Sequence, residues 1–195
     1  MSEDQRQELE ERYSVAARVL HWAMALGFIF MWACGYAMTS LVPEDSALEK
    51  FLFGLHISIG VTLLGLLIIR IAVRSKAPPP PLPQGFAPWE KAASHLGHLA
   101  LYVLPAVIIV LGWAETNFSG YSVRWFGVHM PKIFPSMENL WGFDPGKITE
   151  ELHAWLAYTM LAVAIVHIAA VIKHRWFDGH DVLHRMTFGK AGPKN

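Results

Sequence analysis

The fourth apolar stretch of the chain, residues 151–173, reads ELHAWLAYTMLAVAIVHIAAVIK. It has no Asp, Glu, Lys or Arg between its ends and is long enough to cross a bilayer as one helix. It nevertheless holds two histidines, His153 and His167, fourteen residues apart. Fourteen residues are almost four whole turns, so both imidazoles leave the same helix face, separated by roughly 21 Å along the axis. An ionisable residue at membrane depth is costly, so this pair indicates a functional site near each membrane surface.

The rest of the chain has the composition of a membrane protein. Of its 195 residues, 53% are hydrophobic and only 16% are charged, which is unusual for a soluble domain. Four apolar runs predict transmembrane spans at about 19–39, 51–73, 92–114 and 151–173. We therefore expect an all-α protein, an integral membrane four-helix bundle over residues 18–173, with an N-terminal arm (1–17) and a polar tail (174–195). The first run follows a polar segment and lacks a small-residue cleavage site, so we expect it to be retained as a span rather than removed as a signal peptide.

The connecting segments predict how the bundle lies in the membrane. Prolines at 78–81 and 83 favour an extended connector between the second and third spans, and Pro105 predicts a bend in the third. The longest loop, 115–149, is expected to fold as a cap over one end. Twelve of the sixteen Lys and Arg residues lie in or directly beside the arm, the proline-rich connector and the tail, and four lie in the other two loops. Because cytoplasmic segments hold the excess of positive charge, both termini are expected to be cytoplasmic.

The net charge argues against nucleic-acid binding, and the cysteine content excludes sites that need two cysteines. The formal net charge is zero, so no global positive field exists to collect the phosphates of a nucleic acid. Cys34 is the only cysteine, which rules out an intrachain disulfide and a Cys-x-x-Cys-His attachment of haem. Any haem is therefore held without covalent bonds to cysteine.

The predicted topology gives each histidine in the spans a depth. On the outer level the spans offer His56 and His153. On the inner level His167 has three candidate partners: His21, His95 and His98. Two imidazoles from different helices at one level, with small residues beside them, suit axial ligation of a flat macrocycle inside a bundle. Gly60 lies one turn from His56, and Ala157 and Ala164 lie on the stripe that joins His153 to His167.

These histidines allow two other interpretations. A single buried histidine can simply form a hydrogen bond across helices, but this explains the whole set poorly. A zinc or copper transporter would also use histidines. Transport usually involves carboxylates within the membrane, however, and the apolar cores of the four spans contain none.

Ordered motifs along the chain resemble those of a known family. They are Arg12-Tyr13-Ser14 with Arg18 and His21-Trp22, the His56 span ending at Arg70, Ser94-His95-x-x-His98, Gly112-Trp113, Phe126-Gly127, and Glu151-x-His153 with His167. Together they look like the bacterial di-haem cytochrome b561 family, over nearly everything from Arg12 to Met186.

The resemblance implies two b haems in a multi-pass protein of the bacterial inner membrane. By the family pattern, His56 with His153 would bind the outer haem and His21 with His167 the inner one. Family members move electrons between the quinone pool and a second partner, and some are similar to superoxide oxidase, which passes electrons from superoxide to ubiquinone. A second hypothesis is a haem-bearing anchor subunit of a larger dehydrogenase or hydrogenase complex.

Three further groups of residues are candidates around these haems. Candidates for pairing with haem propionates are Arg18, Arg70 and Arg74. Candidates for a quinone site are His95, His98 and His174. Candidates for concentrating a small anion such as superoxide at the outer end are Arg124, Lys132 and Lys147. His129, His180 and His184 are expected to have no ligand role.

Overall fold

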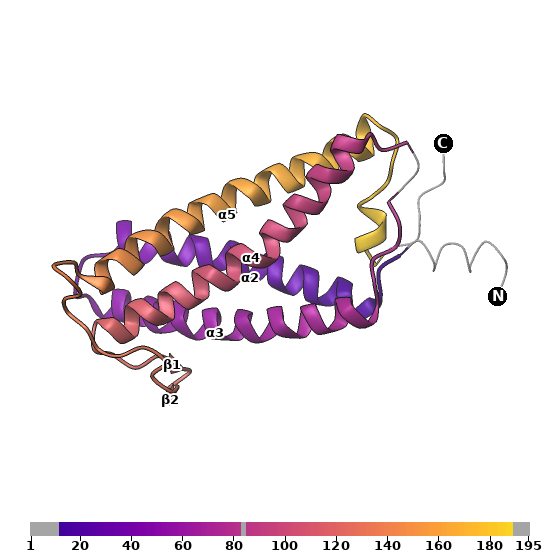
Figure 1. Ribbon diagram of the computed structural model, residues 1–195. Helices are drawn as coiled ribbons and strands as arrows, with labels where there is room; N and C mark the ends of the chain where they lie inside the picture. Colours follow the sequence, from indigo (N-terminus) through magenta and orange to yellow (C-terminus); the bar gives the residue numbers. More distant parts are fainter. Residues whose placement is uncertain (1–11, 83–84, 189–195) are drawn as a thin grey trace.

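The computed structural model describes residues 12–82 and 85–188, so most of the expected N-terminal arm lies outside the described residues. Four long helices dominate it: α2 (Val15–Ser40), α3 (Ala47–Lys76), α4 (Pro88–Phe118) and α5 (Pro145–Trp176). All four have the length and apolar composition needed to cross a membrane. Each expected span lies inside one of them, and the helix continues beyond the span at both ends. The fold is therefore the predicted all-α bundle of four membrane-spanning helices (Figure 1).

Local capping explains where the helices begin. The hydroxyl of Ser14 accepts a hydrogen bond from the amide of Ala17, and the Ser46 hydroxyl accepts one from Glu49. Asp144 does the same for Lys147 at the start of α5. Each side chain satisfies an amide that has no partner within the helix.

The four helices form a bundle with two distinct ends (Figure 1). The terminal end is where α2 and α4 begin and where α3 and α5 end. The loop end holds the short 41–46 connection and the long loop 119–144. Figure 1 also shows α4 changing direction near its middle, where Pro105 is buried within the helix. Proline lacks the amide hydrogen of a helical residue and crowds the preceding turn, so the expected bend is present.

The apolar core is small. It centres on Met24 of α2 with Leu63 and Leu67 of α3. In contrast, none of the residues in the most apolar 18-residue window of α5 is buried. Most of the surface of the helix that carries two histidines is thus not covered by the other helices.

The long loop at the loop end contains a small β-hairpin that lies against α3. Strands β1 (Arg124–Trp125) and β2 (Val128–His129) pair as a hairpin, with Phe126 and Gly127 in the turn at φ of 45° and 89°. The Phe126 amide donates to the hydroxyl of Ser58, at 3.0 Å, and the Trp125 indole donates to Thr62, also at 3.0 Å. These bonds attach the hairpin to α3 within two turns of His56.

The described part of the C-terminal tail, up to Phe188, folds back onto the start of α2, which its polar sequence alone did not indicate. The short helix η1 (His184–Met186) lies beside this start (Figure 1). The Tyr13 amide donates to the Arg185 carbonyl at 3.2 Å, and the Trp22 indole donates to the Met186 carbonyl at 2.9 Å. The tail therefore covers part of the terminal end.

Candidate functional site

At the loop end, His56 of α3 faces His153 of α5. Their ring centroids lie 6.0 Å apart with the planes 61° from parallel. His153 donates from Nδ1 to the carbonyl of Ile108 at 2.8 Å, because a carbonyl can only accept. That bond leaves Nε2 as the nitrogen with a free lone pair. The Nδ1 atom of His56 is buried and has no partner among the described residues.

Two glycines let neighbouring backbones approach these rings. A Cβ added at Gly112 of α4 would lie 3.1 Å from both Cε1 and Nδ1 of His153. A Cβ added at Gly35 of α2 would meet Cε1 of His56 at 3.5 Å, an ordinary contact. Of these two positions, only Gly112 lies so close to a histidine ring that a side chain there would be crowded. Gly60, one turn after His56, instead faces Met31 of α2.

At the terminal end, three imidazoles converge. His167 of α5 lies 6.5 Å from His21 of α2 and 5.5 Å from His98 of α4, between ring centroids. His95 is exposed and donates from Nδ1 to the Lys91 carbonyl, at 2.6 Å, on its own helix. The structure thus brings His21 and His98 to His167 and leaves His95 on the outer surface of α4.

These separations suit a shared metal atom. If two imidazole nitrogens each lie roughly 2 Å from one metal atom on its opposite sides, the ring centroids lie about 6 Å apart. The His56–His153 pair, at 6.0 Å, has this spacing. At the terminal end His21 and His98, at 6.5 Å and 5.5 Å from His167, are equally close to it. Each end of α5 could therefore hold one metal atom between two rings.

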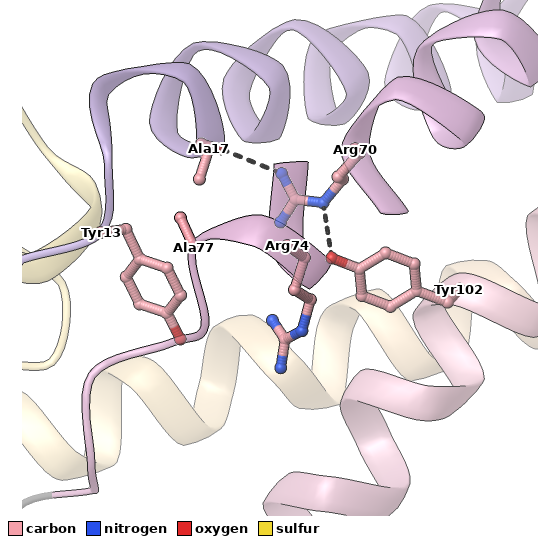
Figure 2. Close-up of a pocket in the computed structure, with 6 residues that line it drawn as sticks. All are labelled: Tyr13, Ala17, Arg70, Arg74, Ala77 and Tyr102. Carbon is pink, nitrogen blue, oxygen red and sulfur yellow. Dashed lines mark hydrogen bonds between the residues drawn. The ribbon is translucent and has the colours of Figure 1, made fainter. Parts of the chain in front are cut away.

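Arg70 joins three helices beside the terminal-end rings. Its Nε donates to the Tyr102 hydroxyl at 3.0 Å, Nη1 donates to the Ala17 carbonyl at 3.1 Å, and Nη2 donates to Nδ1 of His21 at 3.3 Å. Figure 2 shows Arg70 between Ala17 and Tyr102, with Arg74 on the other side of the Tyr102 ring. Arg70 thus connects α2, α3 and α4 through one guanidinium.

Arg18 is a second buried cation at this end. Only 9% of its surface is exposed, and Nη1 donates to the Thr187 carbonyl at 2.8 Å. The Phe188 ring packs over its guanidinium at 5.2 Å. Nε is buried and has no partner among the described residues, so an anionic group could still bind there.

Beyond His167, α5 ends in an ion-pair cluster rather than an open metal site. Glu90, His174 and Asp178 place possible ligand atoms within 4.8 Å of one another, but the Lys173 ammonium contacts Glu90 at 2.9 Å and Asp178 at 2.6 Å. The hydrogen bond from Lys173, and then the one from His174, hold the pKa of the Asp178 carboxyl below its usual value. The cluster ties the start of α4 to the end of α5.

The three loop-end cations have different surroundings. The Lys132 ammonium donates to the Gly120 carbonyl at 2.8 Å and to the Ser136 hydroxyl at 3.1 Å, so it holds the loop together. Arg124, in the hairpin, and Lys147, in the first turn of α5, are exposed. His129 is exposed in the hairpin, and His180 stacks on Phe86 with centroids 5.3 Å apart.

Comparison with known proteins identifies the family. The family model described as prokaryotic cytochrome b561 matches residues 12–189. The chain belongs to the prokaryotic cytochrome b561 family. It is 33% identical over 186 residues to cytochrome b561 homolog 2 of Escherichia coli (strain K12), covering 93% of each chain. It is 26% identical to the probable superoxide oxidase CybB of Yersinia pestis over 94% of this chain and 100% of that protein, and 24% identical to cytochrome b561 homolog 1 of Escherichia coli over 90% and 96%.

Membership in the cytochrome b561 family makes the chain a multi-pass protein of the bacterial inner membrane that binds b-type haem. The residues present fit such a group. The imidazoles face each other at the spacing of axial ligands, Nε2 of His153 is left free by its bond to Ile108, and the buried Nε of Arg18 lacks a partner. A b haem held by two histidines would use all three kinds of group: the ring nitrogens, the hydrogen bonds that orient the rings, and a cation for its carboxylates.

Sequence reasoning missed several residues around this site. Gly112 was noted as a motif, but its contact with His153 depends on how α4 is rotated against α5. Ser58 holds the β-hairpin, and Thr187 covers Arg18. Both roles also depend on contacts across the bundle. The sequence offers one signal for such a close contact, a small residue near a ligand histidine. That signal pointed to Gly60, which faces Met31 instead.

We expect Gly112→Ala to weaken haem binding at the loop end, because the new Cβ would lie 3.1 Å from two atoms of the His153 ring. Gly97→Ala, on the same helix, is the matched control, since nothing lies within 4 Å of a Cβ there. The measurement is the ratio of haem to protein in the purified chain. Equal ratios in the two variants would show that the backbone approach at Gly112 is not needed.

Proposed function

We propose that this chain carries electrons across the inner membrane through two b haems, from superoxide at the periplasmic face to ubiquinone. His56 with His153 hold the haem at the loop end, and His21 with His167 hold the one at the terminal end. The observation that supports this most directly is that α5 meets a facing imidazole at each of its two ends. The relative in Yersinia pestis named as a probable superoxide oxidase supports the choice of donor.

The proposed orientation places the terminal end in the cytoplasm. Arg70 and Arg74 lie there (Figure 2), and Arg18 lies in the first turn of α2 at the same end. The positive-inside rule assigns such segments to the cytoplasmic side. The loop end, with its hairpin and exposed Arg124 and Lys147, then faces the periplasm.

The number of histidines that hold each haem determines whether it transfers electrons or binds oxygen. A b haem held by two histidines would supply a one-electron carrier, and two histidine ligands would favour outer-sphere electron transfer over binding of oxygen at the metal. Each superoxide that gives up one electron leaves as O₂. Two such electrons, with two protons taken from the cytoplasmic side, convert ubiquinone to ubiquinol.

The side chains around the two ends have separate tasks in this scheme. Exposed Arg124 and Lys147 raise the local concentration of a small anion at the loop end. Arg18, Arg70 and Arg74 pair with haem carboxylates at the terminal end. His98, next to His167, and His174, bonded to Asp178 at 2.7 Å, hydrogen-bond the quinone and pass its protons.

We expect His153→Leu and His167→Leu each to lose one of the two haems, because each variant removes one axial nitrogen from a different site. The measurement is haem content per chain, read with the absorbance spectrum. At the terminal end, His21→Leu should lose the same haem as His167→Leu, whereas His98→Leu should keep both. Retention of both haems after His153→Leu or His167→Leu would contradict the assignment.

Removing the loop-end cations should slow haem reduction by superoxide. For the double variant Arg124→Gln with Lys147→Gln we expect a rate roughly two- to tenfold lower at low ionic strength, with the difference fading as salt screens the charges. Lys50→Gln is the control, since Lys50 pairs with Asp45 at 3.3 Å. A wild-type rate that does not change over a salt series would rule out steering.

Substitution of His174 should separate quinone reduction from haem binding. We expect His174→Ala to reduce ubiquinone at least roughly tenfold more slowly, because the proton path through His174 and Asp178 is lost, while both haem spectra stay unchanged. The assay follows ubiquinol formation by the purified chain after pre-reduction of its haems. His129→Ala, at the opposite end, is the control. Turnover equal to wild type would exclude His174 from the quinone site.

A further inference from the structure

The β-hairpin at 124–129 lies against the outer face of α3. His56 of this helix faces α5, and Leu63 belongs to the apolar core. Each residue turns a helix by about 100°, so Ser58 and Thr62 lie on the face opposite His56, away from the bundle. The hairpin is bonded to these two hydroxyls, and Figure 1 shows it outside the bundle, alongside α3.

These contacts place the hairpin below the polar edge of the bundle at the loop end. Glu151 is exposed and marks the start of the uncharged segment of α5. His153 follows it by two residues and lies opposite His56 of α3, which also runs from the loop end to the terminal end. At 1.5 Å per residue, Ser58 and Thr62 therefore lie roughly 6 Å and 12 Å beyond the level of Glu151.

Polarity changes along the hairpin from its base to its turn. Arg124 and His129 are paired at the base, Trp125 and Val128 are paired next to them, and Phe126 lies in the turn. The three apolar side chains of the hairpin are all exposed, by 42% at Trp125, 59% at Val128 and 63% at Phe126. The polar pair is thus the part of the hairpin farthest from the turn.

The hairpin reaches this depth with its turn first and with polar groups of the turn paired. The Phe126 amide donates to Ser58, and the Trp125 indole donates to Thr62, the deeper of the two hydroxyls. An unpaired amide or indole N–H in an apolar surrounding is costly, and these bonds remove that cost. Structural elements that lie in the membrane interface are buried by about 5–10 Å and carry Trp and Phe on their apolar side. The hairpin has this depth and this composition.

The face of α3 beneath the hairpin continues as lipid-facing surface on both sides. Phe51 precedes Ser58 by seven residues, and Ile69 follows Thr62 by seven, so both lie on the same face. They are 63% and 52% exposed. In a chain that crosses the bilayer, such a face is covered by acyl chains, and the hairpin interrupts it at the level of the interface.

We infer that the hairpin is a membrane-inserted element whose occupant is phospholipid of the loop-end leaflet, the leaflet that surrounds the loop end. Trp125, Phe126 and Val128 contact acyl chains just below the headgroups, while Arg124 and His129 stay on the water side. This goes beyond the proposed function and does not depend on which residues hold a haem.

The test is a depth measurement by spin labelling of the holoprotein in nanodiscs of phosphatidylcholine and phosphatidylglycerol. Single cysteines are introduced by Phe126→Cys, Val128→Cys and His129→Cys in a Cys34→Ala background, and each carries a nitroxide. Collisions are measured with O₂, which partitions into lipid, and with a nickel chelate, which stays in water. We expect the O₂-to-nickel ratio at the first two positions to be at least roughly twofold that at His129.

Two reference variants set the scale of this ratio. Glu138→Cys, exposed in the long loop, reports water, and Val166→Cys, at a position 67% exposed in the apolar part of α5, reports lipid. Ratios at Phe126 and Val128 equal to that at Glu138 would place the hairpin in water. Low accessibility to both reagents would mean that protein, such as a second copy of the chain, covers the hairpin. Either result would overturn the inference.

Wild-type protein provides a second measurement that needs no cysteine variant. A carbene-generating reagent that partitions into lipid is photolysed in the same nanodiscs, and the labelled chain is cut with trypsin. Cleavage after Arg124 and Lys132 releases most of the hairpin as peptide 125–132, which should carry label. An unlabelled peptide 125–132 beside labelled peptides from the spans would also overturn the inference. The haem content of the same samples tests the proposed function separately.

Discussion

The structure depends on the rigidity of one helix that carries two histidines close to a whole number of turns apart. Because α5 is continuous from Pro145 to Trp176, His153 and His167 lie on one face at a separation that cannot change independently of the helix. Any partner ring must therefore come from another helix at one of two depths. The neighbouring helices are arranged to provide a ring at each depth.

The antiparallel helix pair α2 and α3 provides those rings because the two helices run in opposite directions. Each of these helices carries a histidine near its own start, His21 in α2 and His56 in α3. Since the two helices run in opposite directions, their starts lie at opposite ends of the bundle. The α2–α3 pair thus places one imidazole opposite each histidine of α5. No second helix with two histidines is needed.

Helix α4 supports the rings of other helices at both ends. Its Ile108 carbonyl and Gly112 backbone adjoin His153, and its Tyr102 hydroxyl holds Arg70 in contact with His21. The bend at Pro105 separates these two tasks along the helix. The ends differ in charge as well as in position, with a fixed guanidinium at one and a carbonyl acceptor at the other.

Several features of this protein followed from the sequence by itself. Each depends only on the geometry of a single helix or on the transfer of apolar side chains from water into lipid. They include the four spans, the bend at Pro105 and the two histidines on one face of α5. Tertiary structure alone decided which rings meet: it brought His98 as well as His21 to His167, turned His95 to the surface, and set Gly112 rather than Gly60 against a histidine. It also folded the tail over Arg18. These outcomes depend on how each helix is rotated and tilted against its neighbours, which is determined by the packing of side chains from distant parts of the chain and leaves no local periodic pattern to read.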